Sequence, residues 1–275
     1  MKKRLFQRKP KKDDFLAENL PSSRPALFWD ILKNEYRKLM GVSLILILFA
    51  VPFLALHFFS DAWIIALERS GEENVAFPRY IFLALNPVAT LIFGLGVAGS
   101  LRIIKRLCYL EPVFFFEDLK LGIKQNGWQS ALNAFLIGLF FSGTYIFRLL
   151  HPDDFVWNIP LGLFALIIYP SFLFAFPIIA TYKTKVGQTF SLGARMYLKT
   201  FVFSLIPLAL FLSPYLFEMI PDLVVKYLVI LVFLFFSSVL LLAFFLYETH
   251  FLDKYINKEN YPELYDRGIH RKKKE

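Results

Sequence analysis

Six long runs without Asp, Glu, Lys or Arg dominate this sequence of 275 residues. A helix that crosses a hydrocarbon core about 30 Å thick needs about 20 apolar residues, so such runs are typical of membrane spans. The sequence therefore predicts an all-α, polytopic transmembrane helix bundle of about six spans within residues 39–247. The six runs are Leu39–Ser60, Tyr80–Leu101, Gln125–Phe147, Phe155–Tyr182, Thr200–Phe217 and Tyr227–Tyr247.

The fourth run is longer than one crossing requires and carries three prolines. Proline removes a backbone donor and bends helices. We therefore expect this span to tilt, to kink, or to begin as an interfacial segment. The prolines are Pro160, Pro170 and Pro177.

The composition also indicates a membrane protein. Hydrophobic residues make up 57% of the chain and charged residues 19%, whereas soluble domains are about half apolar and about a quarter charged. The single cysteine, Cys108, excludes an intrachain disulfide. Helix packing and lipid must therefore hold the fold together.

The distribution of Lys and Arg predicts the orientation, because positively charged loops tend to stay in the cytoplasm. Residues 1–40, 102–124, 183–199 and 248–275 together hold 27 of the 31 Lys and Arg residues. The alternate segments hold four bases and eight acids. Both termini are therefore predicted to be cytoplasmic, and the net charge of +9 reflects a basic cytoplasmic face.

Residues 1–38 are predicted to be a basic cytoplasmic N-terminus that includes an interfacial amphipathic helix, and residues 248–275 a basic cytoplasmic tail, with KKRLFQRKPKK and HRKKKE as solvated stretches. Each Lys or Arg near anionic lipid gains about 1 kcal/mol. The stretches KKRLFQRKPKK and HRKKKE contain no nucleic-acid-binding module. We therefore expect the bilayer, with anionic lipid at its cytoplasmic face, as a partner, and no nucleic acid.

Residues 24–38 are predicted to form an amphipathic helix that leads into the first span. Phe28, Leu32 and Tyr36 follow one another at a spacing of four, opposite charged side chains. A stripe of this kind favours a position in the membrane interface. A partner-binding helix is the alternative interpretation.

The first cytoplasmic loop combines phenylalanines with charged residues and is predicted to form a short surface helix. The helix either docks a partner, such as a transporter subunit, or lies among the lipid headgroups. Under the first interpretation, the docking residues are Phe115, Phe116, Asp118, Lys120 and Lys124.

Polar residues are sparse within the spans, and the sequence predicts no Asp, Glu, Lys or Arg at depth. Such groups usually mark transport pathways. The remaining polar or kinking positions are open to two interpretations, a cavity that faces freed carbonyls or a kink with an amide bonded to a neighbouring helix. These positions are Asn86, Pro87, Asn133, Pro170 and Pro177.

Small residues in the second span predict the close approach of another helix. They are Gly94, Gly96, Ala98 and Gly99. A faint internal repeat is also visible, because LGIKQNGWQSALNAFLIG from Leu121 aligns with LGARMYLKTFVFSLIPLA from Leu192. A helix-loop-helix duplication and chance both remain open.

Patterns typical of catalysis or cofactor binding are absent from the sequence, namely HExxH, GxSxG, Walker A and CxxC. The four His residues do not have the spacing of metal ligands. We therefore predict a non-enzymatic protein without a cofactor. Glu111, Glu117 and Asp118 form the acidic group that a membrane enzyme would have to use.

Three segments resemble the YesL-like family of bacterial integral membrane proteins, whose molecular function is not established. FWDILKNEYRKLMGVSLILILFAVP is similar to the family's opening, NPVATLIFGLGVAGSLRIIKRLCYLE to its second span, and FFEDLKLGIKQNGWQSALNAFLIG to its cytoplasmic loop. The resemblance covers residues 28–250 and carries no active residues. It implies a multi-pass protein of the bacterial cytoplasmic membrane, with a role as an accessory to carbohydrate import.

The leading hypothesis is accordingly a non-enzymatic accessory or regulatory component of a carbohydrate transporter. A small-solute permease, with a path near Asn86, Pro87 and Asn133, is the first alternative. A membrane enzyme that acts on lipid or envelope intermediates is the second.

Overall fold

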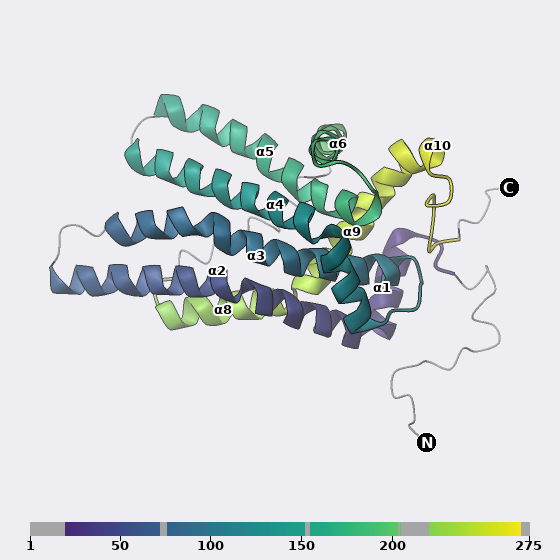
Figure 1. Ribbon diagram of the computed structural model, residues 1–275, viewed down its shortest axis with the longest axis horizontal. Coiled ribbons are helices and arrows are strands. Elements are labelled where there is room, and N and C mark those ends of the chain that lie inside the picture. Colours follow the sequence, from purple (N-terminus) through teal and green to yellow (C-terminus); the bar gives the residue numbers. More distant parts are fainter. Residues whose placement is uncertain (1–19, 72–75, 152–154, 203, 205–219, 271–275) are drawn as a thin grey trace, which may run out of the picture.

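The computed structural model of the chain describes residues 20–71, 76–151, 155–202, 204 and 220–270. Every regular element in these ranges is a helix, as predicted. Four long helices lie side by side and form the bundle seen in Figure 1. They are α2 (Tyr36–Ser70), α3 (Ala76–Cys108), α4 (Phe115–Leu150) and α5 (Phe155–Thr181).

These four helices are each long and apolar enough to cross a membrane. The helices α8 (Leu223–Phe235) and α9 (Ser237–Leu252) belong to a bent pair that meets the same criterion together. The described residues thus form a helical bundle of the kind found in membranes, with four helices able to span, or five if the bent pair is one span. The predicted run Thr200–Phe217 lies almost entirely outside the described residues.

The last predicted span, Tyr227–Tyr247, is not one continuous helix. The chain breaks at Phe236, and the two parts bend by 47°. At the break, the Ser238 amide donates to Ser43 Oγ of α2 at 3.3 Å, and Ser43 Oγ donates to Ser238 Oγ at 2.8 Å. The first amides of a helix have no acceptor within that helix. The Ser43 hydroxyl of α2 supplies an acceptor for one of these amides of α9.

Exposed aromatic residues lie at both ends of the apolar part of α2. Tyr36 and Trp63 are 47% and 44% exposed. They are separated by about 40 Å along the helix, at about 1.5 Å per residue. This separation matches a bilayer with its headgroups, about 40–45 Å thick, and Tyr and Trp are enriched at its two interfaces.

The helices α3 and α4 pack closely, because small residues face one another along both. A Cβ atom on Gly94 would lie 2.6 Å from the Ser130 carbonyl oxygen, and one on Gly122 would lie 2.9 Å from the Ala98 carbonyl oxygen. The small residues of the second span therefore admit α4, as the pattern predicts. Gly96 instead faces Phe49 of α2.

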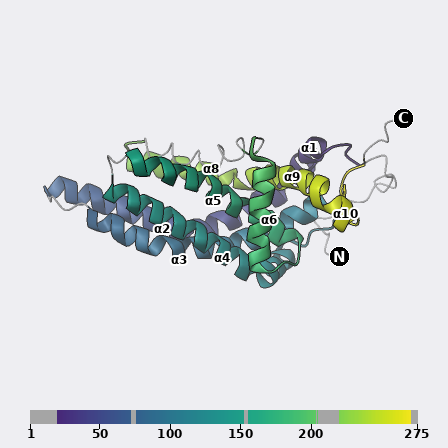
Figure 2. The ribbon, with the colours of Figure 1, turned by 90° about the horizontal axis from the view of Figure 1, so that it is seen from above.

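The helix α6 (Val186–Lys199) lies across the bundle. It is seen end-on in Figure 1 and along its length in Figure 2. A Cβ atom on Gly193 would lie 2.6 Å from the Ser171 carbonyl oxygen of α5. Gly122 of α4 approaches α3 in the same way, at a point ten residues before α3 ends. The two halves differ in length, because α4 continues as a span whereas α6 ends at Lys199. The repeat stays a prediction.

The helix α1 (Arg24–Asn34) packs against α9 at one end of the bundle. Its most buried apolar residues are Leu27 and Ile31, whereas Phe28 and Leu32 are partly buried. Tyr36 is exposed and belongs to α2, because the predicted helix 24–38 ends at Asn34. The buried stripe is therefore shifted by one residue from the predicted one, because α1 packs on protein.

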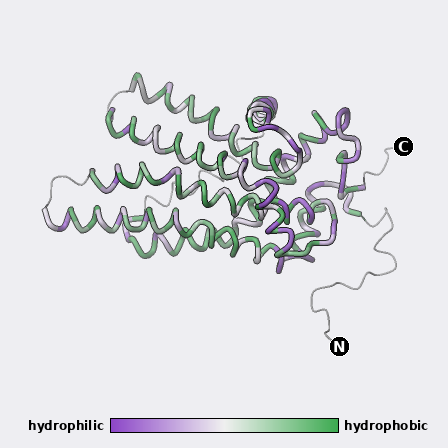
Figure 3. The backbone as a smooth tube through the Cα atoms, in the orientation of Figure 1, coloured by the Kyte–Doolittle hydropathy of each residue, from purple (hydrophilic) through white to green (hydrophobic). Residues whose placement is uncertain are grey.

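The C-terminal segment is folded against the same end up to His270, and the rest of the stretch HRKKKE, which is predicted to be solvated, lies outside the described residues. After α9 come the π-helical turn η3 (Asp253–Asn257) and the short α10 (Lys258–Asn260). The His270 amide then donates to the Pro21 carbonyl oxygen at 2.9 Å. We call this region the polar end: α1, the turn between α3 and α4, the first turns of α4, and residues 253–270. Figure 3 shows hydrophilic residues gathered there.

Candidate functional site

The polar end is organised around Asp118, which lies in the first turn of α4 and is fully buried. Its Oδ1 accepts from Arg106 and, at 3.4 Å, from Arg102, both in the last turns of α3. Its Oδ2 accepts from the Phe114 amide at 2.8 Å, just before the helix begins. One carboxylate thus holds the residue just before α4 and fixes the start of α4 to α3.

The predicted surface helix of the first cytoplasmic loop is not a separate element. It forms the opening turns of α4, which continues unbroken to Leu150. Phe115 packs into the apolar core, where its ring lies against Gly41 of α2. The structure therefore assigns Phe115 and Asp118 to the interior.

The other predicted docking residues lie on the outer face of α4. Phe116 is 77% exposed, Lys120 and Lys124 are exposed, and Trp128 is 72% exposed. These four residues follow one another at a spacing of four and form one side of the helix, which we call the α4 face.

A second ion-pair chain ties the C-terminal segment to the α3–α4 turn. Glu111 accepts from Arg106 at 3.2 Å and from Arg267 at 2.8 Å. Two acids of the cluster that an enzyme would use, Glu111 and Asp118, are therefore engaged by arginines. The third, Glu117, is exposed.

A third network is fully internal. Arg24 donates to Asp253 at 2.6 Å, and both side chains are buried. Asp253 Oδ1 accepts from Asn257 at 2.8 Å, and Asn257 Oδ1 accepts from the Tyr182 hydroxyl.

The predicted intramembrane amides are engaged between helices. Asn86 Nδ2 donates to the Gly138 carbonyl oxygen at 3.3 Å and to Ser142 Oγ at 3.2 Å. Asn133 Nδ2 donates to the Phe172 carbonyl oxygen of α5 at 2.9 Å. Of the two interpretations, the one in which an amide bonds to a neighbouring helix describes these contacts. The side-chain oxygens of both asparagines are buried and have no hydrogen-bond partner.

The prolines of α5 all lie inside one helix. At one of them, a side chain of another helix supplies the hydrogen bond that the proline cannot donate. Pro170 has no amide hydrogen for the Leu166 carbonyl, four residues earlier. The Tyr197 hydroxyl of α6 donates to this oxygen at 2.8 Å. Pro87 packs closely on Gly138, where a Cβ atom would lie 2.9 Å from Pro87 Cα. No comparable contact is seen for Pro177 among the described residues.

Two charged groups were missed by sequence reasoning. Glu248 of α9 is fully buried, and neither of its carboxyl oxygens has a hydrogen-bond partner. Lys226 of α8 is buried and donates to Asp61 of α2 at 2.9 Å, although both were assigned to loops. Asp61 could have been placed from the length of the helix, because α2 extends beyond its uncharged run and so includes this residue.

No group of three or more His, Cys, Asp or Glu residues that could hold a metal ion occurs among the residues that the structure describes. Cys108 is buried at the end of α3.

Comparison with models of known families, with curated proteins and with solved structures finds no match to this chain. The family resemblance, the non-enzymatic nature and the partners therefore stay predictions.

Proposed function

We propose that this protein is a non-enzymatic component of the bacterial cytoplasmic membrane that docks a partner protein through the α4 face. In this proposal the chain has six spans and both termini in the cytoplasm, so the polar end is cytoplasmic. The resemblance to the YesL-like family points to a transporter of carbohydrates as the assembly that it serves. The observation that carries the proposal is the exposed Phe116, held rigidly outside the apolar part of α4.

Phe116 is separated from the apolar part of α4 by charged turns. It lies eight residues, or about 12 Å, beyond Lys124 along the helix axis. The headgroup layer on each side of a bilayer is about 5–8 Å thick. An aromatic residue at this distance is poorly placed to enter lipid and well placed to enter a pocket on another protein.

The α4 face is pre-organised for docking. Asp118 lies on the opposite side of the first turns of α4 and joins them to Arg102 and Arg106 of α3. Contact surfaces that do not have to become ordered on binding lose less free energy. Lys120 and Lys124 favour a partner whose surface carries acidic residues around an apolar pocket.

The test is co-purification of the tagged full-length chain from native membranes in mild detergent. We expect the same partner to be recovered repeatedly with the wild type. Phe116→Ser together with Lys120→Glu should reduce its recovery at least about tenfold, as expected for loss of a central aromatic anchor and a complementary charge.

The matched control is Phe59→Ser. Phe59 is 68% exposed on α2, toward the other end of the bundle, and its replacement should leave recovery unchanged. Purification of the wild-type chain alone in repeated trials would contradict the proposal, as would equal recovery with the two variants.

A small-solute permease remains the second candidate, and one observation favours it. Several buried polar atoms in the interior of the bundle have no hydrogen-bond partner, which is the condition for ordered water or a polar solute. They are Asn86 Oδ1, Ser100 Oγ, Ser130 Oγ and Asn133 Oδ1. Solute uptake by vesicles that contain only this chain, abolished by Asn86→Leu, would support it.

A further inference from the structure

The helix α6 runs across the long axis of the bundle, whereas α2 to α5 run along it (Figures 1 and 2). Its inner side is fixed to α5. The Phe190 ring packs on the Phe172 ring, with 5.0 Å between the centroids. The Tyr197 hydroxyl donates to the Leu166 carbonyl oxygen at 2.8 Å. A helix that runs across the spans lies parallel to the plane of a membrane, which is the orientation of interfacial helices.

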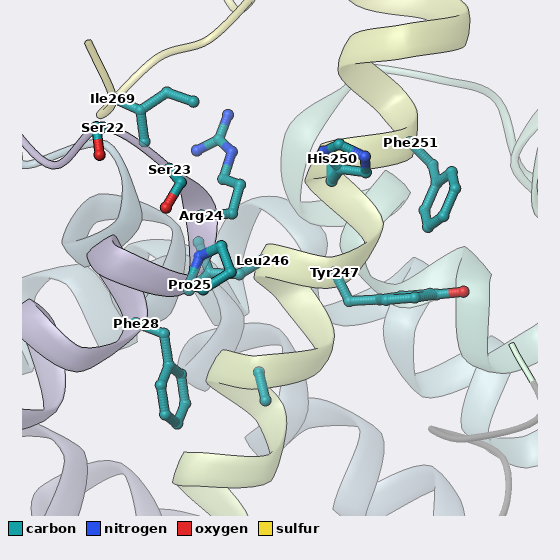
Figure 4. A pocket seen from close by; sticks show the side chains of 11 residues that line it. Ser22, Ser23, Arg24, Pro25, Phe28, Leu246, Tyr247, His250, Phe251 and Ile269 are labelled. Atoms are coloured by element: carbon teal, nitrogen blue, oxygen red, sulfur yellow. The ribbon is translucent and has the colours of Figure 1, made fainter. Parts of the chain in front are cut away.

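The chain that follows α6 is fixed to α9. Thr200 Oγ1 and Ser204 Oγ lie 2.8 Å apart, and Ser204 Oγ lies 3.3 Å from the Tyr247 hydroxyl oxygen. In Figure 4 the Tyr247 side chain points away from Pro25 and Phe28 of α1. Contacts with both α5 and α9 therefore hold α6 in its orientation.

The depth of α6 follows from its neighbours on α5 and α4. Gly193 packs against the Ser171 carbonyl oxygen, and the next carbonyl oxygen, that of Phe172, accepts from Asn133 of α4. Asn133 lies about 7.5 Å along α4 from the exposed Trp128. Exposed tryptophan is typical of the membrane interface, and interfacial helices lie about 5–10 Å into that boundary. The level of α6 is thus the one expected for a helix in the plane of the interface.

The outward side of α6 is divided along its length into two flanks. Leu198 and Phe201 form an apolar flank and are 60% and 37% exposed. Arg195 and Lys199 form a basic flank and are exposed as well. The Lys199 ammonium lies over the Tyr255 ring of η3, 5.0 Å from its centroid. The basic flank therefore faces the polar end, and the apolar flank faces the apolar part of the bundle.

Four bases accompany α6, and the protein does not neutralise them. Lys183 and Lys185 precede the helix, Arg195 and Lys199 belong to it, and all four are exposed. The sequence contains no Asp or Glu in residues 155–217. Within the part of the chain that the structure describes, none of the four takes part in an ion pair, in contrast to the arginines of the polar end. Their charges are therefore available to an anion from outside the protein.

We propose that α6 lies in the membrane interface and binds the headgroups of anionic phospholipids. The bases that bind are Lys183, Lys185, Arg195 and Lys199. Bases beside an anionic lipid surface are stabilised by it, and no acid of this segment opposes the attraction. The bilayer is the occupant, because the two flanks of one helix meet at the depth where acyl chains and headgroups meet. This surface is separate from the α4 face and from the basic stretches at the two ends of the chain.

Fluorescence quenching in vesicles tests the position of α6. A fluorophore on the full-length variant Leu198→Cys reports on the apolar flank, and Cys108 does not compete for the label because it is buried. Phosphatidylcholine with brominated acyl chains should quench this label at least about threefold more strongly than a label on Glu259→Cys of α10, because the apolar flank lies among acyl chains. Equal quenching of the two labels would overturn the proposal, since α6 would then face water or another protein.

The label on Leu198→Cys also tests the preference for anionic lipid. The vesicles consist of phosphatidylcholine with a minor fraction of phosphatidylglycerol, and bromine is placed on one lipid or on the other. We expect phosphatidylglycerol to be enriched at the label at least about threefold over its share of the vesicle. Arg195→Gln together with Lys199→Gln should lower this enrichment at least about twofold, because two of the four bases are lost.

The matched control is Lys33→Gln together with Arg37→Gln. It removes two exposed bases from α1 and the start of α2 and should leave the enrichment at the wild-type level. Quenching in proportion to the share of each lipid would overturn the proposal. So would an enrichment that persists in Arg195→Gln with Lys199→Gln, or one that falls equally in the control.

Discussion

At the scale of the residue, three acidic side chains that are equally buried differ in their surroundings. Asp118 and Asp253 each accept from arginine, whereas Glu248 has no hydrogen-bond partner. Burial of a charge is costly unless the charge is paired. The two paired aspartates should therefore respond to the same chemical change differently from Glu248.

Asp118→Asn should lower the free energy of unfolding by about 2 kcal/mol, because it leaves Arg102 and Arg106 without their shared carboxylate. Thermal unfolding in detergent measures the change. The exposed neighbour provides the control: Glu117→Gln should stay within about 0.5 kcal/mol of the wild type. Equal effects at the two positions would show that Asp118 does not hold α4 to α3.

Glu248→Gln should leave stability within about 0.5 kcal/mol of the wild type or raise it, because the amide has a similar shape and carries no charge to desolvate. Asp253→Asn is the matched control and should cost about 2 kcal/mol through loss of the Arg24 pair. The same unfolding assay applies. A loss above about 1 kcal/mol in Glu248→Gln would indicate that the carboxyl has an ionic partner.

At the scale of the element, small residues and prolines decide how the helices meet. Gly122 allows α4 to touch the backbone of α3, and Gly193 allows α6 to touch α5. Pro170 frees a carbonyl that α6 then engages through Tyr197. Close backbone approach thus replaces the hydrophobic effect, which is weak between helices in lipid.

Gly122→Ala should destabilise the protein by about 1–3 kcal/mol, because the added Cβ atom would lie 2.9 Å from backbone atoms of Ala98 and Gly99. Gly143→Ala, on the same helix, is the control. No atom lies within 4 Å of its added Cβ atom, so it should gain up to about 1 kcal/mol from helix propensity. The reverse order of the two unfolding temperatures would refute the close α3–α4 contact.

Tyr197→Phe should cost about 1 kcal/mol, since the Leu166 carbonyl would lose its donor. In a Pro170→Ala background the same change should cost less than about 0.5 kcal/mol, because the alanine amide restores the helical hydrogen bond. A double-mutant cycle of unfolding free energies measures the coupling. Additive effects would mean that the hydroxyl does not compensate for Pro170.

At the scale of the whole molecule, the charge distribution predicts how the bundle lies in the membrane. The segments rich in Lys and Arg include the α3–α4 turn and residues 253–270, which are parts of the polar end. The opposite end of the bundle has few bases. This asymmetry favours a cytoplasmic position for the polar end.

Reporter fusions test this orientation. Green fluorescent protein at either terminus should fluoresce, and alkaline phosphatase inserted after Gly71 or His151 should be active, because these turns lie at the opposite end from α1. Alkaline phosphatase inserted after Glu111 should be inactive and serves as the control. Activity at Glu111 together with inactivity at Gly71 would reverse the predicted orientation.

The sequence by itself determined the class of the protein and the position of most helices. Long uncharged runs can satisfy their backbone groups in lipid only as helices, so α2 to α5 could be read directly from composition. The small residues of α3 and the prolines of α5 were also visible, because their effects are local.

Only the tertiary structure decided how these elements are used. Asp118 and Phe115 turn inward because α4 packs on α3 and α2, while Phe116 and Lys120, beside them in the sequence, remain exposed. The Arg24–Asp253 pair joins residues 229 positions apart, and no sequence pattern indicates such a contact. Which side of a helix is buried depends on its neighbours, and those neighbours are determined by the packing of the whole bundle.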